Sequence, residues 1–302
     1  MSLFIIILSH MLLVKHVFSA ALLEAGEDSR RGQDSLETPR ISARSAEGLL
    51  LALPPACGTL AYIEEDNGIH GGTLKRIAQL VQMTKTLGSP QRDYVILSEG
   101  NTSAKIDSRS FWVKASGSRM AHARSDGFLK VDTTKVLDLV DGPDLKEAEM
   151  GLRLAETKVD LEAPGSPSIE TAMHALCLTT GGASFVGHTH PTAINAILCA
   201  RDAASAFANS LFPAESLVCG TPVFVPYGGP GQALARAVRD SLETALRERG
   251  ESPRALLLQN HGLVALGESP QQVLDITEMM VKTARILVQT YALGGPRFID
   301  YR

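Results

Sequence analysis

Apolar and polar positions along the chain change repeatedly between a helical period and an extended period, which predicts alternating helices and strands. The first predicted helix covers residues 73–87 and ends at Gly88. Its apolar face carries Leu74, Ile77, Leu80 and Val81. Short apolar runs at 94–97 and 111–114 predict strands, each followed by a polar turn with glycine. This mixture favours an α/β domain over a helical bundle or a β-sandwich.

The second half of the chain repeats the pattern. A predicted strand at 183–186 leads through Gly-His-Thr-His-Pro into a predicted helix at 192–207. Two apolar runs, 255–258 and 263–266, flank the turn at 259–262 and predict a hairpin with histidine in its turn. The last predicted helix has Ser269 as its cap, with Pro270 at the first helical position and Gln272 three residues after the cap. Its inner face carries Val273, Ile276, Met280, Ala284 and Leu287.

The first 47 residues have a different character. An apolar segment at 3–14 resembles a signal peptide, but Lys15 follows that segment, whereas a secretory signal places its positive charge in front. The segment is also too short to span a bilayer, so we expect no stable membrane anchor. Residues 24–47 lack apolar periodicity and predict a linker. We therefore expect a folded domain at 48–302, and a signal peptide and a wrongly assigned start both remain open for the beginning of the chain.

Composition narrows the choice of partner and compartment. With 44% apolar and 21% charged residues, the chain is typical of a globular protein. Lys and Arg number 29 against 33 Asp and Glu, so no basic excess is available for nucleic acid, and we expect no nucleic-acid partner. The four cysteines form no C-x-x-C pair, which predicts a reducing, cytoplasmic location rather than a disulfide scaffold.

Three histidines are the strongest chemical signal. His188 and His190 are two residues apart on an extended segment, so both imidazoles leave the same face and can converge on one metal ion. His261, in the predicted hairpin turn, is a candidate third ligand. Spacing alone leaves open that one histidine is a buried, hydrogen-bonded residue and another lies on the surface. Both turns follow apolar runs, where a rigid scaffold presents a site to solvent.

Glu170 has two interpretations. Ser168 predicts the cap of a short helix, which places Glu170 in its first turn, where an acid stabilises the helix dipole. Alternatively, Glu170 supplies a carboxylate to the histidine site. His174 lies four residues later on the same helical face, as a core or supporting histidine.

Four segments together resemble the class II aldolase/adducin family of sugar-phosphate aldolases, epimerases, dehydratases and decarboxylases. They are EGNTSAK at 99–105, VKASGS at 113–118, SPSIETAMH at 166–174 with GHTHP at 187–191, and QNHGLVALG at 259–267. Their order and spacing are most similar to rhamnulose-1-phosphate-aldolase-type members. The resemblance implies that residues 48–302 form a single three-layer α/β/α catalytic domain around a mainly antiparallel sheet, assembled as a homotetramer.

The resemblance also implies roles for individual residues. His188, His190 and His261 match the metal ligands, with Zn²⁺ as the expected ion and Co²⁺ or Mn²⁺ as substitutes. Glu170 matches the catalytic acid/base. The family's phosphate-binding turns match Gly100, Asn101, Ser116, Gly117 and Ser168. Ile169 stands where many aldolases carry a second serine, which removes one phosphate contact.

The predicted function is that of a metal-dependent lyase. It would cleave a ketose 1-phosphate, or a related sugar or sugar-acid phosphate, by a retro-aldol reaction through a metal-stabilised enediolate. Tyr291 and Tyr301 are candidates for the base at the C4 hydroxyl. Two alternatives stay open: an epimerase, dehydratase or decarboxylase with the same metal site, and an adducin-like interaction domain without chemistry.

Overall fold

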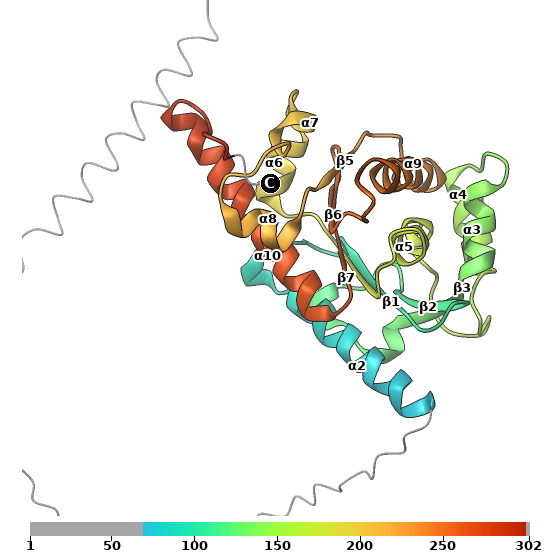
Figure 1. The fold of residues 1–302 in the computed structure, drawn as a ribbon. Coiled ribbons are helices and arrows are strands. Elements are labelled where there is room, and N and C mark those ends of the chain that lie inside the picture. The colour runs from blue at the N-terminus through green and yellow to red at the C-terminus, as the bar shows by residue number, and fades with distance from the viewer. Residues whose placement is uncertain (1–68, 300–302) are drawn as a thin grey trace, which may run out of the picture. The chain divides into compact units, whose positions relative to one another are not determined.

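A seven-stranded sheet lies at the centre of the computed structural model, which describes residues 69–299 (Figure 1). The strands are ordered β3-β2-β1-β4-β7-β6-β5, and every neighbouring pair is antiparallel except β5 and β6. The mainly antiparallel sheet is thereby confirmed. The strands are β1 Asn101–Lys105, β2 Ser110–Lys114, β3 Phe128–Asp132, β4 Phe185–Thr189, β5 Val223–Val225, β6 Ala255–Leu258 and β7 Gly262–Gly267.

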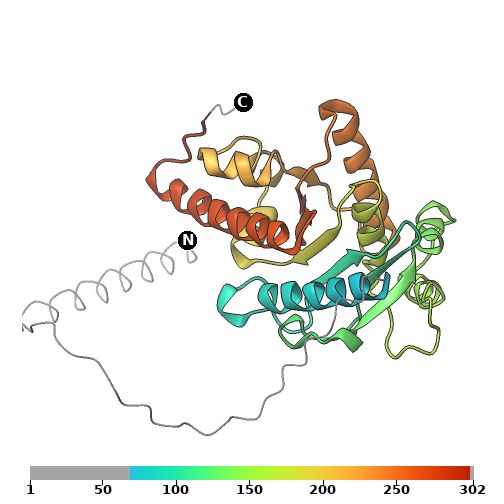
Figure 2. The same ribbon diagram turned by 60° about the horizontal axis from the view of Figure 1, so that its bottom comes forward.

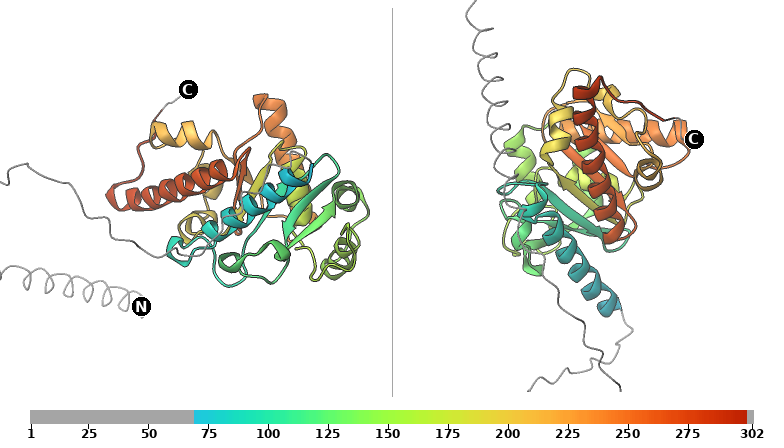
Figure 3. Two further views of the ribbon diagram at one scale, coloured as in Figure 1. Left: turned by 90° about the horizontal axis from the view of Figure 1, so that it is seen from below. Right: turned by 90° about the vertical axis from the view of Figure 1, so that its left-hand side faces the viewer.

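Helices cover both faces of the sheet, and together with it they make three layers. One face packs against α2, α6 and α10, and the other against α3, α5 and α9 (Figures 2 and 3 show α2 and α10 on the same side of the sheet). The α-helices are α2 Ile69–Leu87, α3 Thr133–Asp141, α4 Glu147–Ala155, α5 Thr171–Leu178, α6 Thr192–Leu198, α7 Ala203–Ala206, α8 Pro213–Cys219, α9 Gln232–Arg249 and α10 Pro270–Thr290. Short 3₁₀ helices are η1 Pro90–Arg92, η2 Met120–His122, η3 Ser125–Gly127 and η4 Tyr291–Leu293.

Alternate residues of each central strand enter different hydrophobic layers. In β6, Ala255 and Leu257 pack with α2 and α10, whereas Leu256 and Leu258 pack with α5 and α9. Because both faces of the sheet are buried, the strand is apolar without interruption. The three-layer α/β/α domain is therefore confirmed. The predicted boundary at residue 48, the linker and the apolar start lie outside the described residues.

Two local predictions are confirmed in detail. The predicted hairpin is the antiparallel pair β6 and β7. Helix α10 begins at Pro270, and the Ser269 hydroxyl accepts a hydrogen bond from the Gln272 amide at 3.2 Å. All five of its predicted inner residues are buried. Between residues 69 and 299, no helix is both long enough and apolar enough to cross a membrane.

The predicted strand at 94–97 is wrong. This segment is irregular, with Leu97 at φ +51° and 67% exposed, and the strand β1 follows it at 101–105, where a turn was predicted. The reason is that β1 is polar yet buried. Its hydroxyls have partners inside the protein, such as Thr84 Oγ1 at 2.6 Å from Thr102 Oγ1, and an apolar pattern cannot reveal such a strand.

The predicted helices also need correction. The helix expected at 192–207 is two short helices, α6 and α7, because the amide of Asn260 bonds to the Leu198 carbonyl at 3.2 Å where the first helix ends. Leu74, predicted to face the core, is 69% exposed. The sequence expectations omitted α9, although its buried residues recur at helical spacing; they include Leu234, Val238, Leu242 and Ala245.

Candidate metal centre

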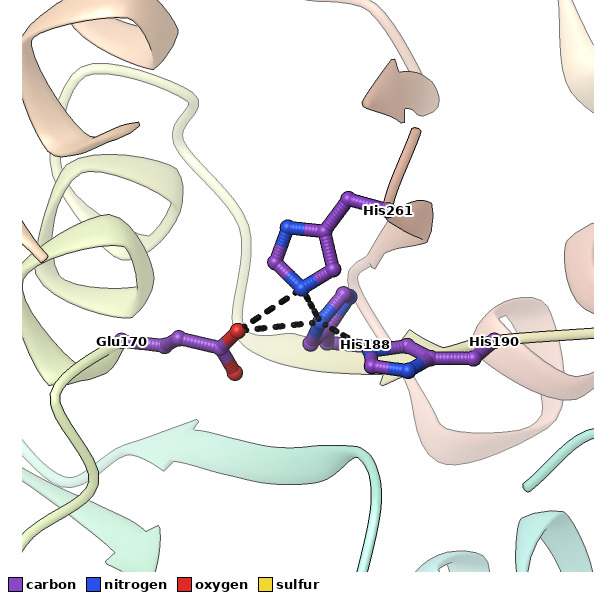
Figure 4. A group of neighbouring side chains, drawn as sticks. All are labelled: Glu170, His188, His190 and His261. Atoms are coloured by element: carbon purple, nitrogen blue, oxygen red, sulfur yellow. Dashed lines mark hydrogen bonds and ion pairs between the residues drawn. The ribbon is translucent and has the colours of Figure 1, made fainter. Parts of the chain in front are cut away.

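Three imidazoles and one carboxylate converge at the ends of central strands (Figure 4). His188 lies in β4, His190 follows that strand, and His261 lies in the β6–β7 turn. Glu170 directly precedes α5. One ligand atom from each residue lies within 4.8 Å of all the others. The predicted site residues are thus brought together from three separate parts of the chain.

Local backbone geometry makes this convergence possible. A Cβ atom on Gly262 would lie 2.5 Å from the Thr189 carbonyl oxygen and 2.9 Å from His190 Cδ2, so a side chain there would force the histidine turns apart. Asn195, from α6, donates its amide to the His261 carbonyl at 3.0 Å and anchors the hairpin turn. The two histidine segments therefore approach as closely as the glycine allows.

The nitrogen atoms are arranged as a metal site requires. His188 Nδ1–H donates to the Leu263 carbonyl at 3.0 Å, which leaves the lone pair of His188 Nε2 directed into the cluster. That Nε2 lies 2.9 Å from His190 Nε2 and 3.2 Å from His261 Nε2. Tetrahedral Zn²⁺ with bonds of about 2.0–2.1 Å holds its nitrogen ligands about 3.3 Å apart. The residues present therefore fit one divalent ion.

Glu170 points at the histidines rather than at its own helix. Its Oε1 lies 2.9 Å from His261 Nε2 and 3.5 Å from His188 Nε2. Burial acts to raise the pKa of the Glu170 carboxyl, but the neighbouring imidazoles of His188 and His261 outweigh it and hold the pKa well below its usual value. The carboxyl is therefore ionised at neutral pH.

The helix-dipole interpretation of Glu170 is not supported. Helix α5 begins at Thr171, three residues after the predicted cap Ser168, so Glu170 stands before the first turn. The Glu170 carboxylate makes no capping bond to the helix. The Ser168 hydroxyl instead accepts a hydrogen bond from the Glu170 amide at 3.3 Å, and this tight turn places the Glu170 side chain at the cluster.

Burial also acts on the remaining histidines. Burial, followed by the neighbouring His188 and His261, lowers the pKa of His190 to about 3, so this imidazole is neutral and keeps a lone pair for a metal. For His188, burial acts to lower the pKa, but the adjacent Glu170 carboxylate raises it above its ordinary value.

The predicted phosphate-binding residues lie in three adjoining turns. Asn101 Nδ2 is 3.3 Å from Ser168 Oγ, and the Ser116 amide donates to the Ser166 carbonyl at 2.9 Å. Ser116 and Gly117 are exposed. Gly100 has φ +69°, and a Cβ there would lie 2.7 Å from the His188 carbonyl oxygen, so this turn contacts the end of β4.

A pocket of about 280 Å³ opens beside the cluster, between the β6–β7 turn and the glycine-rich segment 228–231. Glu170 and His261 line it on the cluster side, and Ile169 lines it close to Gly231. Ile169 thus contributes an apolar wall to this pocket.

Sequence analysis did not single out Lys114, which holds one of the predicted phosphate-binding turns. Its ammonium is buried and donates to the Ser118 carbonyl at 2.6 Å and the Ala115 carbonyl at 3.1 Å, which holds the turn containing Ser116. Burial lowers the pKa of Lys114 to about 8, against an opposing effect of the Glu170 carboxylate. The sequence could have indicated this contact. A lysine that ends an apolar strand just before a glycine turn can donate to the backbone carbonyls of that turn.

Two tyrosines, Tyr291 and Tyr301, are the candidates for the base at the C4 hydroxyl. Tyr291 lies in η4 and is 65% exposed, and it has no described contact with the histidine cluster. Tyr301 lies outside the described residues.

Comparison with known proteins agrees with this geometry. Residues 78–288 match the Class II Aldolase and Adducin N-terminal domain family. The chain belongs to this family. Class II aldolases are metal-dependent, and the His/Glu cluster of this chain could hold such a metal ion.

The proteins that this chain is similar to are named for different reactions. The chain is 28% identical over 239 residues to the uncharacterized oxidoreductase YuxG of Bacillus subtilis, covering 74% of this chain and 32% of that protein. It is 25% identical to the 3-oxo-tetronate 4-phosphate decarboxylase of Haemophilus influenzae, covering 65% of this chain and 80% of the relative. The fold is similar to that of L-fuculose-1-phosphate aldolase from Thermus thermophilus, with a TM-score of 0.52 at 19% identity, covering 74% of this chain and all of that one.

Proposed function

We propose that this protein is a metal-dependent lyase that cleaves a ketose 1-phosphate, or a related sugar or sugar-acid phosphate, by a retro-aldol reaction. The observation that supports the proposal most directly is the convergence of His188, His190 and His261 with the ionised carboxylate of Glu170. Three neutral imidazoles leave most of a divalent ion's charge uncompensated, and this donor set suits Zn²⁺ better than Mg²⁺ or Ca²⁺. Such an ion supplies Lewis-acid stabilisation of negative charge on substrate oxygens.

Proton transfer and phosphate binding would be carried out by residues of the chain itself. When the C3–C4 bond breaks, its electron pair stays on C3, and that carbon must gain a proton. The C4 hydroxyl loses a proton as the bond breaks, which balances the proton that C3 gains. Glu170, ionised at rest, would first take up a proton and then give it to C3, because its carboxyl group contacts the cluster and lines the adjoining pocket. Ser168 supports phosphate binding: its hydroxyl oxygen accepts bonds from two amides, and its own hydrogen is left to donate. Gly100, Asn101, Ser116 and Gly117 complete the proposed phosphate turns.

A panel assay tests this function. Purified protein, stripped of metal and reconstituted with Zn²⁺, Co²⁺ or Mn²⁺, is mixed with ketose 1-phosphates, and released dihydroxyacetone phosphate is measured. We expect metal-dependent release. Glu170→Gln should lower kcat by about 10²- to 10⁴-fold while metal stays bound, because the amide cannot take up a proton at neutral pH. His261→Ala should lower metal content and activity together.

Two results would exclude the aldolase proposal. One is the absence of cleavage across the panel at full metal occupancy. The other is a Glu170→Gln variant that turns over substrate within a few-fold of wild type.

A decarboxylase is the second candidate, favoured by the match over 80% of the Haemophilus decarboxylase. Loss of CO₂ from a β-keto sugar acid also leaves electrons next to a carbonyl, so the same residues would serve. A 3-oxo-tetronate 4-phosphate added to the panel, with CO₂ release as the readout, separates the two reactions. An epimerase or dehydratase would conserve the carbon skeleton and release neither product.

An adducin-like interaction domain is the least supported alternative, because a pure scaffold has no physical need for three converging imidazoles. We also propose that the enzyme is a cytoplasmic homotetramer. The cysteines in the described part of the chain, Cys177, Cys199 and Cys219, are free thiols, as expected in a reducing compartment. Light scattering of the purified protein tests the tetramer.

A further inference from the structure

A continuous row of hydrogen bonds runs from Glu170 into the protein interior. Asn101 Nδ2 lies 2.6 Å from Glu170 Oε2, the other end of the same amide contacts His174 Nε2, and His174 Nδ1 lies 2.7 Å from Ser103 Oγ. Asn101 and Ser103 alternate along β1 and so face α5, which carries His174. Thr102, between them, faces α2 instead.

The chemistry of the four groups fixes the direction of every bond in this row. The Glu170 carboxylate can only accept, so Asn101 must turn its NH₂ toward Glu170. The Asn101 carbonyl oxygen then faces His174 and can only accept, so His174 Nε2 must carry the hydrogen. His174 Nδ1 is left as an acceptor, and the Ser103 hydroxyl donates to it.

Burial makes this order stable. His174 has no exposed surface, and burial, followed by the effect of the neighbouring His188, lowers the pKa of its imidazole to about 3, so it stays neutral. A neutral imidazole with one donor and one acceptor matches the row, whereas with an imidazolium Ser103 Oγ would have to accept and the Ser103 hydroxyl hydrogen would lose its acceptor in the row. Each buried polar atom of His174 is thereby satisfied, and the row has a single low-energy arrangement.

We propose that His174 is a positioning residue for the acid/base Glu170, acting through Asn101. It fixes the amide orientation of Asn101, whose NH₂ holds Glu170 Oε2 and leaves Oε1 facing the imidazoles of His188 and His261. Both ends of the Asn101 side chain are committed to this task, so any contact of Asn101 with substrate comes from its backbone. The inference rests on the proposed function, because it assigns His174 to the same reaction.

Three variants test the positioning role in the metal-loaded protein. His174→Leu removes the donor at similar volume, and we expect kcat to fall about 10- to 100-fold, a range typical of residues that orient catalytic groups, with KM and metal content nearly unchanged. His174→Gln places an NH₂ near the former Nε2 and should recover most of kcat. Thr102→Val is the matched control, because it breaks a buried hydroxyl contact of 2.6 Å on the opposite face of β1. It should lower the melting temperature and leave kcat alone.

A double-mutant cycle shows whether His174 acts through Glu170. In a Glu170→Gln background, adding His174→Leu should lower kcat by less than twofold. Full additivity of the two effects would overturn the proposal, as would equal kcat values for His174→Leu and wild type.

Neutron crystallography of the wild-type protein gives a readout that needs no variant and no activity. It should show deuterium on His174 Nε2 and the Asn101 ND₂ group facing Glu170. Deuterium on Nδ1 with a bare Nε2 would overturn the proposal even if the enzyme is an aldolase. A protein with the expected deuterium positions that cleaves no ketose 1-phosphate would instead refute the proposed function and keep the bond order.

Discussion

His174 should make the stability of this protein depend on pH in a window where most carboxylates are already ionised. The pKa of His174 is about 3 in the folded chain, first because of burial and then because of His188, against about 6.5 for an unfolded histidine. Below pH 6.5 the unfolded chain therefore takes up a proton that the folded chain does not accept until about pH 3. The contribution of His174 to stability is complete above pH 6.5 and decreases as the pH falls.

The size of the effect follows from these two pKa values. Well below pH 6.5 and above pH 3, one extra proton on the unfolded chain lowers the free energy of unfolding by about 1.4 kcal/mol per pH unit. Between pH 6.5 and 5.5 the loss is about 1 kcal/mol, because half of the unfolded chains are already protonated at pH 6.5. The imidazole is completely buried, so solvent screening does not reduce this figure.

The assay compares wild type with His174→Gln by urea denaturation at pH 7.5, 6.5 and 5.5, at one fixed protein concentration because an oligomer's stability depends on it. Subtracting the variant removes the pH dependence of all other groups. The difference, wild type minus His174→Gln, should decrease by about 1 kcal/mol from pH 6.5 to 5.5. His122→Gln, which removes an exposed imidazole, is the control. A difference that stays flat for His174→Gln would refute the buried, neutral His174 on which the Glu170 row depends.

Three further predictions concern other parts of the chain. Elemental analysis of purified, unchelated protein should find one transition-metal ion per chain, and far less than one equivalent with no rise in melting temperature on adding Zn²⁺ would contradict the metal centre. Gly117→Ala, at φ +75° in open space, should lower the free energy of unfolding by about 1–2 kcal/mol in denaturation experiments. Gly100→Ala, at φ +69° and with a new Cβ 2.7 Å from the His188 carbonyl oxygen, should lower it by about 1–3 kcal/mol more. Equal losses for the two variants would argue against the tight approach of the Gly100 turn to β4. Deleting residues 1–45 should leave the fold intact, and a fall in melting temperature of more than about 5 °C would show that the linker assignment is wrong.

The sequence predicted the fold well where apolar spacing alone determines structure. The β6–β7 hairpin is predicted by two uninterrupted apolar runs around a turn, and α10 by buried residues that recur at helical spacing. It failed at β1, whose Asn101, Thr102 and Ser103 are polar and buried. Each of these side chains is satisfied by a group distant in sequence, so the strand becomes recognisable only when α2 and α5 are in place.

The candidate site, too, could be predicted from residue spacing only in part. The H-x-H pair and the histidine in the hairpin turn indicated a metal centre by spacing, since a strand end and a tight turn constrain where imidazoles point. Glu170 could be assigned only through the family resemblance, because the residues around it locally predict a helix-dipole acid. What directs its carboxylate is the pairing of β1 with β4, in which Asn101 lies opposite His188. That register, which spans 87 residues of sequence, sets the Asn101 amide beside the histidines and so determines where Glu170 can point; local periodicity carries no information about it.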